Sequence, residues 1–239
     1  MAGPDWLQAW LPSRRLTARE LLSRYLVAWC YLAGFAISEL VYLNLSAPAQ
    51  DSLLGWASTS VDNLRHDPVG SLVASAFVAP DSPWGSLLLI SLALFGANRA
   101  LGNWRLVVVC GAGHVIGTLV SEGIEWWRIA HGQLPASDAL LLDVGISYVV
   151  VAATVVAIGF GSWPGRAAAV VDLALLIFGA HIFGGLSQLD VPAVGHFTAI
   201  VMAITLGFPL AAGYRRAQAR PGSGREAEGG DEAADHVLG

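Results

Sequence analysis

Two polar residues lie near the starts of apolar stretches in this chain, where their types and spacing could support chemistry. Ser147 follows Gly145 by two positions in one stretch, and His196 lies near the start of another. A serine becomes a nucleophile when a histidine accepts its proton and nearby amides stabilise the developing oxyanion. The glycine allows the sharp backbone turn that would expose such amides. The pair therefore predicts nucleophilic serine chemistry, provided that the two stretches meet at the same depth.

The elements that carry these residues are predicted to be membrane-spanning helices. The chain has 239 residues, of which 55% are hydrophobic and 13% charged, and its mean hydropathy is +0.58. Soluble domains carry about 25% charged residues. The apolar residues are gathered into runs of about 20, the length that crosses a bilayer as a helix. We therefore expect an all-α, polytopic membrane protein.

Six spans are predicted, at residues 25–45, 84–101, 105–125, 141–161, 166–186 and 192–213. They form a membrane domain over residues 25–213, after an N-terminal cytoplasmic segment at 1–24. Residues 46–83 are too polar to span and too apolar for a plain linker, so they are expected to form an interfacial outer loop. Residues 214–239 have the composition of a disordered cytoplasmic tail.

The arginines predict the orientation of these spans. The chain has no lysine, and with the N-terminus inside, eleven of its arginines fall in cytoplasmic segments and two in outer ones. An excess of basic residues marks the cytoplasmic side. This bias favours an even number of spans, both termini in the cytoplasm and a location in the cell membrane.

The predicted topology places Ser147 and His196 at the same level. Spans four and six both run inward, and each residue lies on the order of 6 Å below the start of its helix. Ala199, Ala203 and Gly207 follow His196 on one helical face, so a neighbouring helix could approach closely. Each residue also has a structural interpretation. Membrane serines often bond back to a carbonyl of their own helix, and a lone histidine can bridge helices.

Other ionisable residues within the spans are candidates for supporting roles, because charge is costly in a bilayer. Asp143 is predicted to cap the fourth span, with orientation of an imidazole as the alternative. His114 could be a polar neighbour of the site. His181 lies near the outer level, where a helix-bridging role is expected. Glu39 and Asp172 are expected to pair with polar groups across helices.

The sequence resembles a rhomboid intramembrane serine protease, of a divergent bacterial branch. The likeness covers most of residues 25–213 and rests on six spans, a long first loop, Gly-x-Ser in the fourth span and a histidine with small residues at +3 and +7 in the sixth. Residues 94–105 also resemble the rhomboid junction between spans two and three. The resemblance implies a six-helix rhomboid-like bundle in which Ser147 is the nucleophile and His196 the general base. Gly145 would be the first glycine of Gly-x-Ser-Gly.

The family resemblance also implies an activity and its partners. Such proteins cleave transmembrane substrates near the outer membrane face, without a metal or cofactor and without nucleic acid. The sequence departs from the family at Tyr148, which replaces the second glycine, and in span two, which lacks His-x-x-x-Asn. These departures leave a second hypothesis open, an inactive rhomboid-like pseudoprotease that binds membrane proteins. A third is a cofactor or transport protein that uses His114, His181 and His196, although no internal repeat is evident.

Overall fold

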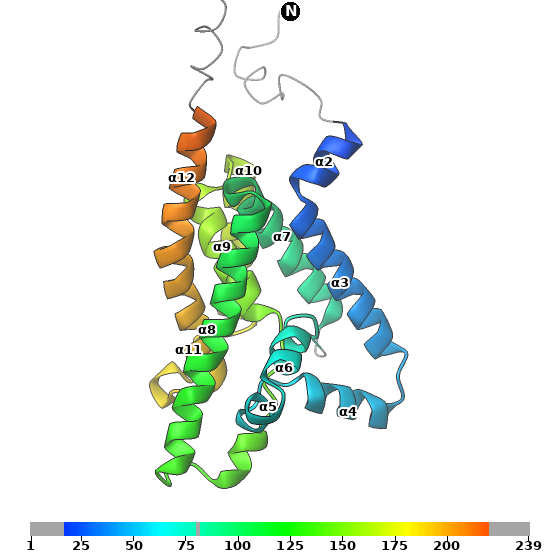
Figure 1. Ribbon diagram of the computed structural model, residues 1–239, viewed down its shortest axis with the longest axis vertical. Coiled ribbons are helices and arrows are strands. Elements are labelled where there is room, and N and C mark those ends of the chain that lie inside the picture. Colours follow the sequence, from blue (N-terminus) through cyan, green and yellow to red (C-terminus); the bar gives the residue numbers. More distant parts are fainter. Residues whose placement is uncertain (1–16, 80–81, 220–239) are drawn as a thin grey trace, which may run out of the picture.

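The computed structural model describes residues 17–79 and 82–219, and within them the regular elements are all helical (Figure 1). The α-helices are α2 (Ala18–Arg24), α3 (Leu26–Leu43), α4 (Ala47–Ala57), α5 (Val61–His66), α6 (Pro68–Ser75), α7 (Pro83–Leu101), α8 (Asn103–Ala130), α9 (Ser147–Phe160), α10 (Trp163–Ala174), α11 (Val191–Met202) and α12 (Phe208–Ala219). Short 3-10 turns form η1 (Ala136–Leu140) and η3 (Leu186–Gln188), and wide π turns form η2 (Leu175–Gly179) and η4 (Ala203–Gly207).

Four helices of the described residues are long and apolar enough to cross a membrane: Leu26–Leu43, Pro83–Leu101, Asn103–Ala130 and Val191–Ala217, the last of which joins α11, η4 and α12. Two further apolar elements, α9 and α10 with η2, are shorter and pack inside the same bundle. The prediction of an all-α, polytopic bundle is confirmed.

Several helix boundaries differ from the predicted spans. The third helix continues to Ala130 rather than ending at residue 125. The fourth begins at Ser147 rather than at residue 141, since residues 141–145 are non-helical and bonded to other segments. The fifth ends at Gly179 rather than at residue 186, and His181 just beyond it has a left-handed φ of 52°.

Helix α9 lies at the centre of the bundle and contacts α7, α8, α10 and α11. Small residues allow these close approaches. A Cβ added to Gly113 would lie 2.9 Å from Ala152, and one added to Gly207 would lie 2.5 Å from Val156. Nearly all residues of α9 from Tyr148 to Ala157 are buried. This central helix therefore fixes the direction in which Ser147 and Tyr148 point.

The junction between α7 and α8 holds the start of α3. The Asn98 side chain accepts the Ala28 amide at 3.2 Å and donates to the Arg24 carbonyl at 3.1 Å. Asn103 donates to the Ser23 carbonyl at 2.9 Å. The asparagines of the segment 94–105, on α7 and α8, thus connect these helices to α2 and α3 at one end of the bundle.

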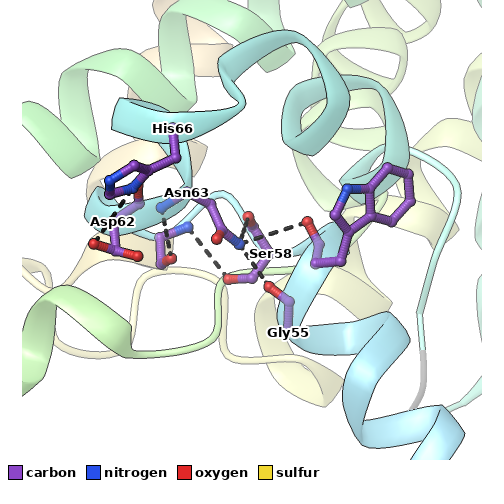
Figure 2. Close-up of polar contacts among 7 residues, drawn as sticks. Gly55, Ser58, Asp62, Asn63 and His66 are labelled. Carbon is purple, nitrogen blue, oxygen red and sulfur yellow. Dashed lines mark hydrogen bonds and ion pairs between the residues drawn. The ribbon is translucent and has the colours of Figure 1, made fainter.

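Helices α4, α5 and α6 lie at the opposite end of the bundle from α2 and the end of α12, and this is called the loop end below (Figure 1). Their fold depends on Asn63, whose amide donates to the carbonyls of Gly55 at 2.5 Å and Ser58 at 2.8 Å (Figure 2). These bonds close the corner between α4 and α5, and they direct Ser58 and Thr59 toward the bundle. The predicted outer loop is therefore a folded unit of three short helices.

Candidate functional site

The non-helical segment before α9 is held by the α4–α5 corner. The Asp143 amide donates to Ser58 Oγ at 2.9 Å, and the Thr59 amide donates to the Asp143 carbonyl at 2.8 Å. The Thr59 hydroxyl also lies 3.1 Å from Asp143 Oδ2. The Asp143 carboxylate is therefore occupied by Thr59, and Ile146, not Asp143, stands at the N-cap of α9. The interpretation of Asp143 as the helix cap was wrong because α9 begins only at Ser147, after a non-helical segment at residues 141–145.

Gly145 forms the turn into α9. Its φ is 147°, a conformation that residues with a side chain rarely adopt. Its amide donates to the Ser75 carbonyl of α6 at 3.2 Å. The glycine therefore provides the turn that the sequence indicated, while its own amide is bonded to the loop and not free for an oxyanion.

Ser147 is the first residue of α9 and lines a cavity of about 630 Å³ between α7, α9 and η2. No side chain caps this helix start. The first amides of an α-helix have no partner within the helix, so the amides at Ser147 and Tyr148 remain able to donate. The cavity walls are largely apolar and include Leu88, Leu175 and Leu176. A hydroxyl and unbonded amides thus stand beside an apolar cavity.

Tyr148 points away from that cavity, between α8 and α11. A Cβ added to Gly195 would lie 2.1 Å from the Tyr148 ring, and one added to Gly117 would lie 3.4 Å from it. The Tyr148 hydroxyl donates to the Val191 carbonyl at 3.3 Å. Glycines on both neighbouring helices therefore make the space for the residue that replaces the family's second motif glycine.

His196 is buried beside Tyr148, with ring centroids 5.1 Å apart in an edge-on arrangement. Its Nδ1 lies 2.9 Å from the Ile182 carbonyl, so Nδ1 carries the proton that this bond requires. Nε2 is then an unprotonated acceptor, and it is buried with no partner. The hydrogen bonds among residues 17–79 and 82–219 include none between His196 and Ser147. The structure places both residues near the loop end, where His196 contacts Tyr148 rather than the serine.

His114 links α8 to the loop. Its Nε2 lies 2.9 Å from the Leu72 carbonyl and 3.2 Å from Ser75 Oγ, both on α6. Its ring centroid is 6.1 Å from that of Tyr148. His114 is thus a neighbour of Tyr148, and its bonds hold the loop helix that also bonds to Gly145.

The remaining predicted site residue, His181, is exposed just after η2. Its ring bonds to the Gly179 carbonyl at 3.2 Å, and among the described residues it forms no hydrogen bond to α9 or α11. Residue 182, its neighbour, provides the carbonyl that His196 contacts. The segment 181–182 therefore contacts His196 through the backbone carbonyl of Ile182 and not through the imidazole of His181.

One family model, described as rhomboid-like protein, matches residues 24–217. The chain belongs to the rhomboid-like family. Comparisons with curated proteins and with solved structures gave no match. In this rhomboid-like protein a first span and a folded loop are followed by α7, α8, α9, α10 with η2, and α11 to α12, and α9 contacts α7, α8, α10 and α11.

Several residues that shape the site were not singled out from the sequence. Ser58, Thr59 and Ser75 hold the segment 143–145, and Glu125 lines a second cavity described below. The three hydroxyl residues lie in the loop, where short polar side chains are common, so no spacing distinguished them. Glu125 had a detectable signal, because it lies one helical turn after Glu122 on a continuous helical face.

Proposed function

We propose that this rhomboid-like, multi-pass membrane protein binds transmembrane segments of other membrane proteins in the cavity between α7 and η2. The observation that carries the proposal is the cavity itself, about 630 Å³ with largely apolar walls. Leu88 on α7 and Leu175 on η2 are both exposed and line it. An apolar helix from a client could therefore pack against either wall without first displacing a buried side chain.

Binding without cleavage accounts best for the geometry around α9. Tyr148 fills the space beside His196, and its hydroxyl is held by the Val191 carbonyl. Proton transfer from a serine requires direct hydrogen-bond reach to the base, or reach through one water. Ser147 lines the cavity between α7, α9 and η2, which is called the client cavity below. His196 is not among the residues that line it. We therefore place client binding ahead of hydrolysis.

A second candidate function, intramembrane serine hydrolysis, is favoured by the tautomer of His196. The bond to Ile182 leaves Nε2 as a buried, unpartnered acceptor, which is the state of a general base. After a movement at the start of α9, Nε2 would take the proton of Ser147 as Oγ attacks a peptide carbonyl. The amides at the helix start would donate to the oxyanion, and His196 would return the proton to the leaving amine.

The orientation that we propose puts the loop end outside the cell and both termini in the cytoplasm. Arg65 and Arg128 belong to the loop end, whereas α2 and the end of α12 lie at the other end with most of the arginines. Cytoplasmic segments carry the excess of basic residues. Labelling of single-cysteine variants at residues 52 and 216 with a membrane-impermeant maleimide in intact cells tests this. Reaction at residue 52 alone is the expected result.

The decisive experiment uses the full chain reconstituted with a panel of single-span model proteins. A photo-crosslinking amino acid at Leu88 or Leu175 should capture the model span. The same residue at Leu119, which is exposed on α8 but outside the cavity, should not. Equal capture from all three positions, or from none, would refute client binding in this cavity.

A fluorophosphonate probe separates the two candidate functions. Labelling that is lost in Ser147→Ala and in His196→Ala, together with cleavage of the captured span, would establish hydrolysis. Capture without labelling or cleavage, and unchanged in Ser147→Ala, would establish binding alone.

A further inference from the structure

A second cavity, of about 380 Å³, opens at the loop end between α8, η1 and the residues that precede α11. Its lining contains five acidic side chains and one basic one, Arg128. The acidic residues are Glu122, Glu125, Asp138, Asp143 and Asp190. The segment 141–147 separates it from the client cavity, because residues 141–143 line the acidic cavity and residues 144–147 line the other.

Among these acidic residues, Glu125 indicates a binding site, because it is buried and faces the cavity. Its side chain lines the cavity, and only 6% of the residue is exposed. The hydrogen bonds and ion pairs of the described residues include none to its carboxylate. Arg128, one turn further along α8, donates instead to the Leu189 carbonyl at 3.4 Å. The carboxylate faces a cavity whose other charged side chains are four acids and Arg128, the one positive charge among them, so a cationic ligand that reaches Glu125 would be stabilised by charge.

The walls of the cavity indicate the kind of cation. Apolar side chains provide all of the remaining lining: Leu134, Leu141, Leu142, Leu189, Val191 and Pro192. The aliphatic stem of an arginine or lysine packs well on such a wall while its charged group reaches polar partners. Among residues 17–79 and 82–219, no group of three or more His, Cys, Asp or Glu side chains has a geometry that could hold a metal ion. The lining therefore fits a guanidinium or ammonium group on an aliphatic stem.

We propose that the acidic cavity binds the side chain of an arginine or lysine that flanks a bound transmembrane segment at the loop end. The source of this ligand rests on the proposed client binding. The segment 141–147 lines both cavities, so a client helix that ends beside Ser147 places its next residues near residues 141–143. The site would then select clients by a basic residue at that end of their span.

The test uses the full chain in nanodiscs and two single-span peptides that differ only by arginine or glutamine at the flanking position. The arginine peptide should bind about 10-fold more tightly, a difference of about 1.4 kcal/mol. Glu125→Gln and Asp138→Asn should each reduce this preference several-fold. Asp51→Asn, an exposed carboxylate on α4 outside the cavity, should leave it unchanged. Agmatine, which carries a guanidinium on an aliphatic stem, should compete with the arginine peptide. It should leave the binding of the glutamine peptide unchanged.

The outcomes separate this proposal from the function on which it rests. If both peptides bind with equal affinity, client binding stands and the basic-residue site is refuted. If neither peptide binds, client binding fails, and equilibrium dialysis with labelled agmatine decides the cavity alone. Agmatine binding that is lost in Glu125→Gln then supports a cation site, whereas absence of binding overturns it. Tighter binding of Ca²⁺ than of agmatine would also overturn the proposal, in favour of a metal site.

Discussion

Tyr148 and His196 meet edge-on, with their ring centroids 5.1 Å apart, and the two rings come from neighbouring helices that Gly195 allows to approach. Edge-to-face contacts of this kind add to the stabilisation that burial provides. The residue that follows Ser147 therefore has a structural role beside the histidine, whereas Ser147 itself, one position earlier, lines the cavity between α7, α9 and η2.

The Tyr148 ring should contribute strongly to stability. Tyr148→Ala is expected to lower the free energy of unfolding by about 3–5 kcal/mol, the usual cost of removing a buried aromatic ring. Tyr148→Phe keeps the ring and loses the polar contacts of the hydroxyl, which include the bond to the Val191 carbonyl, so it should cost about 1 kcal/mol. Unfolding in mixed detergent–SDS micelles measures both values. Similar losses for the two variants would show that the hydroxyl, not the ring, is the important contact.

Gly195 should tolerate no side chain. A Cβ there would lie 2.1 Å from the Tyr148 ring, so Gly195→Ala must displace the ring or separate α9 from α11. Overpacking of this kind costs about 1–3 kcal/mol. Gly123→Ala on α8 is a matched control, because nothing lies within 4 Å of its added Cβ. The thermal midpoint of the detergent-solubilised protein should fall for the first variant and hold or rise for the second.

The Thr59 hydroxyl should control the mobility of the segment before α9. Thr59→Val removes its bonds to Asp143 while retaining the shape of the side chain. Amide hydrogen exchange over residues 141–146 should accelerate several-fold, with a loss of about 1 kcal/mol in local stability. Ser52→Ala, on the exposed face of α4, serves as the control. Unchanged exchange in Thr59→Val would mean that the backbone bonds to Ser58 and Thr59 suffice.

Thr154 and Asp172 should behave as a coupled pair between α9 and α10. Thr154 donates to Asp172 Oδ2, both residues are fully buried, and Asp172 Oδ1 has no partner. Thr154→Ala is expected to cost about 1–3 kcal/mol, because it leaves a buried carboxyl group without its donor. Thr154→Ala combined with Asp172→Leu should cost less than the sum of the single changes. Strict additivity in this double-mutant cycle would contradict a direct coupling.

Much of the fold could be predicted from the sequence because a bilayer restricts the possible architectures. Apolar runs of about 20 residues must be helical where they cross lipid, so the all-α bundle followed from hydropathy. Hydropathy did not predict the short central helix α9. Residues 141–146 are apolar enough to continue a span, but residues 141–145 are non-helical, and Asp143 and Gly145 bond to the loop instead.

The sequence could name candidate site residues but not the directions of their side chains. The prediction named Gly145, Ser147 and His196, and in the structure His196 lies beside Tyr148, the residue after Ser147. Two successive helical residues point about 100° apart, so the sequence alone could not decide whether Ser147 or Tyr148 faces α11. That choice depends on Gly117 and Gly195, whose missing side chains leave room for the tyrosine.

The wide turn η2 gives one wall of the client cavity an unusual property. It includes Leu175, Leu176 and Gly179, all of which line that cavity. A π turn holds one residue more than an α-helical turn, and such turns are frequent at functional sites. Its return to α-helical spacing would rotate every later residue by about 100° and advance it by about 1.5 Å. In that register a different set of side chains would form this wall of the cavity.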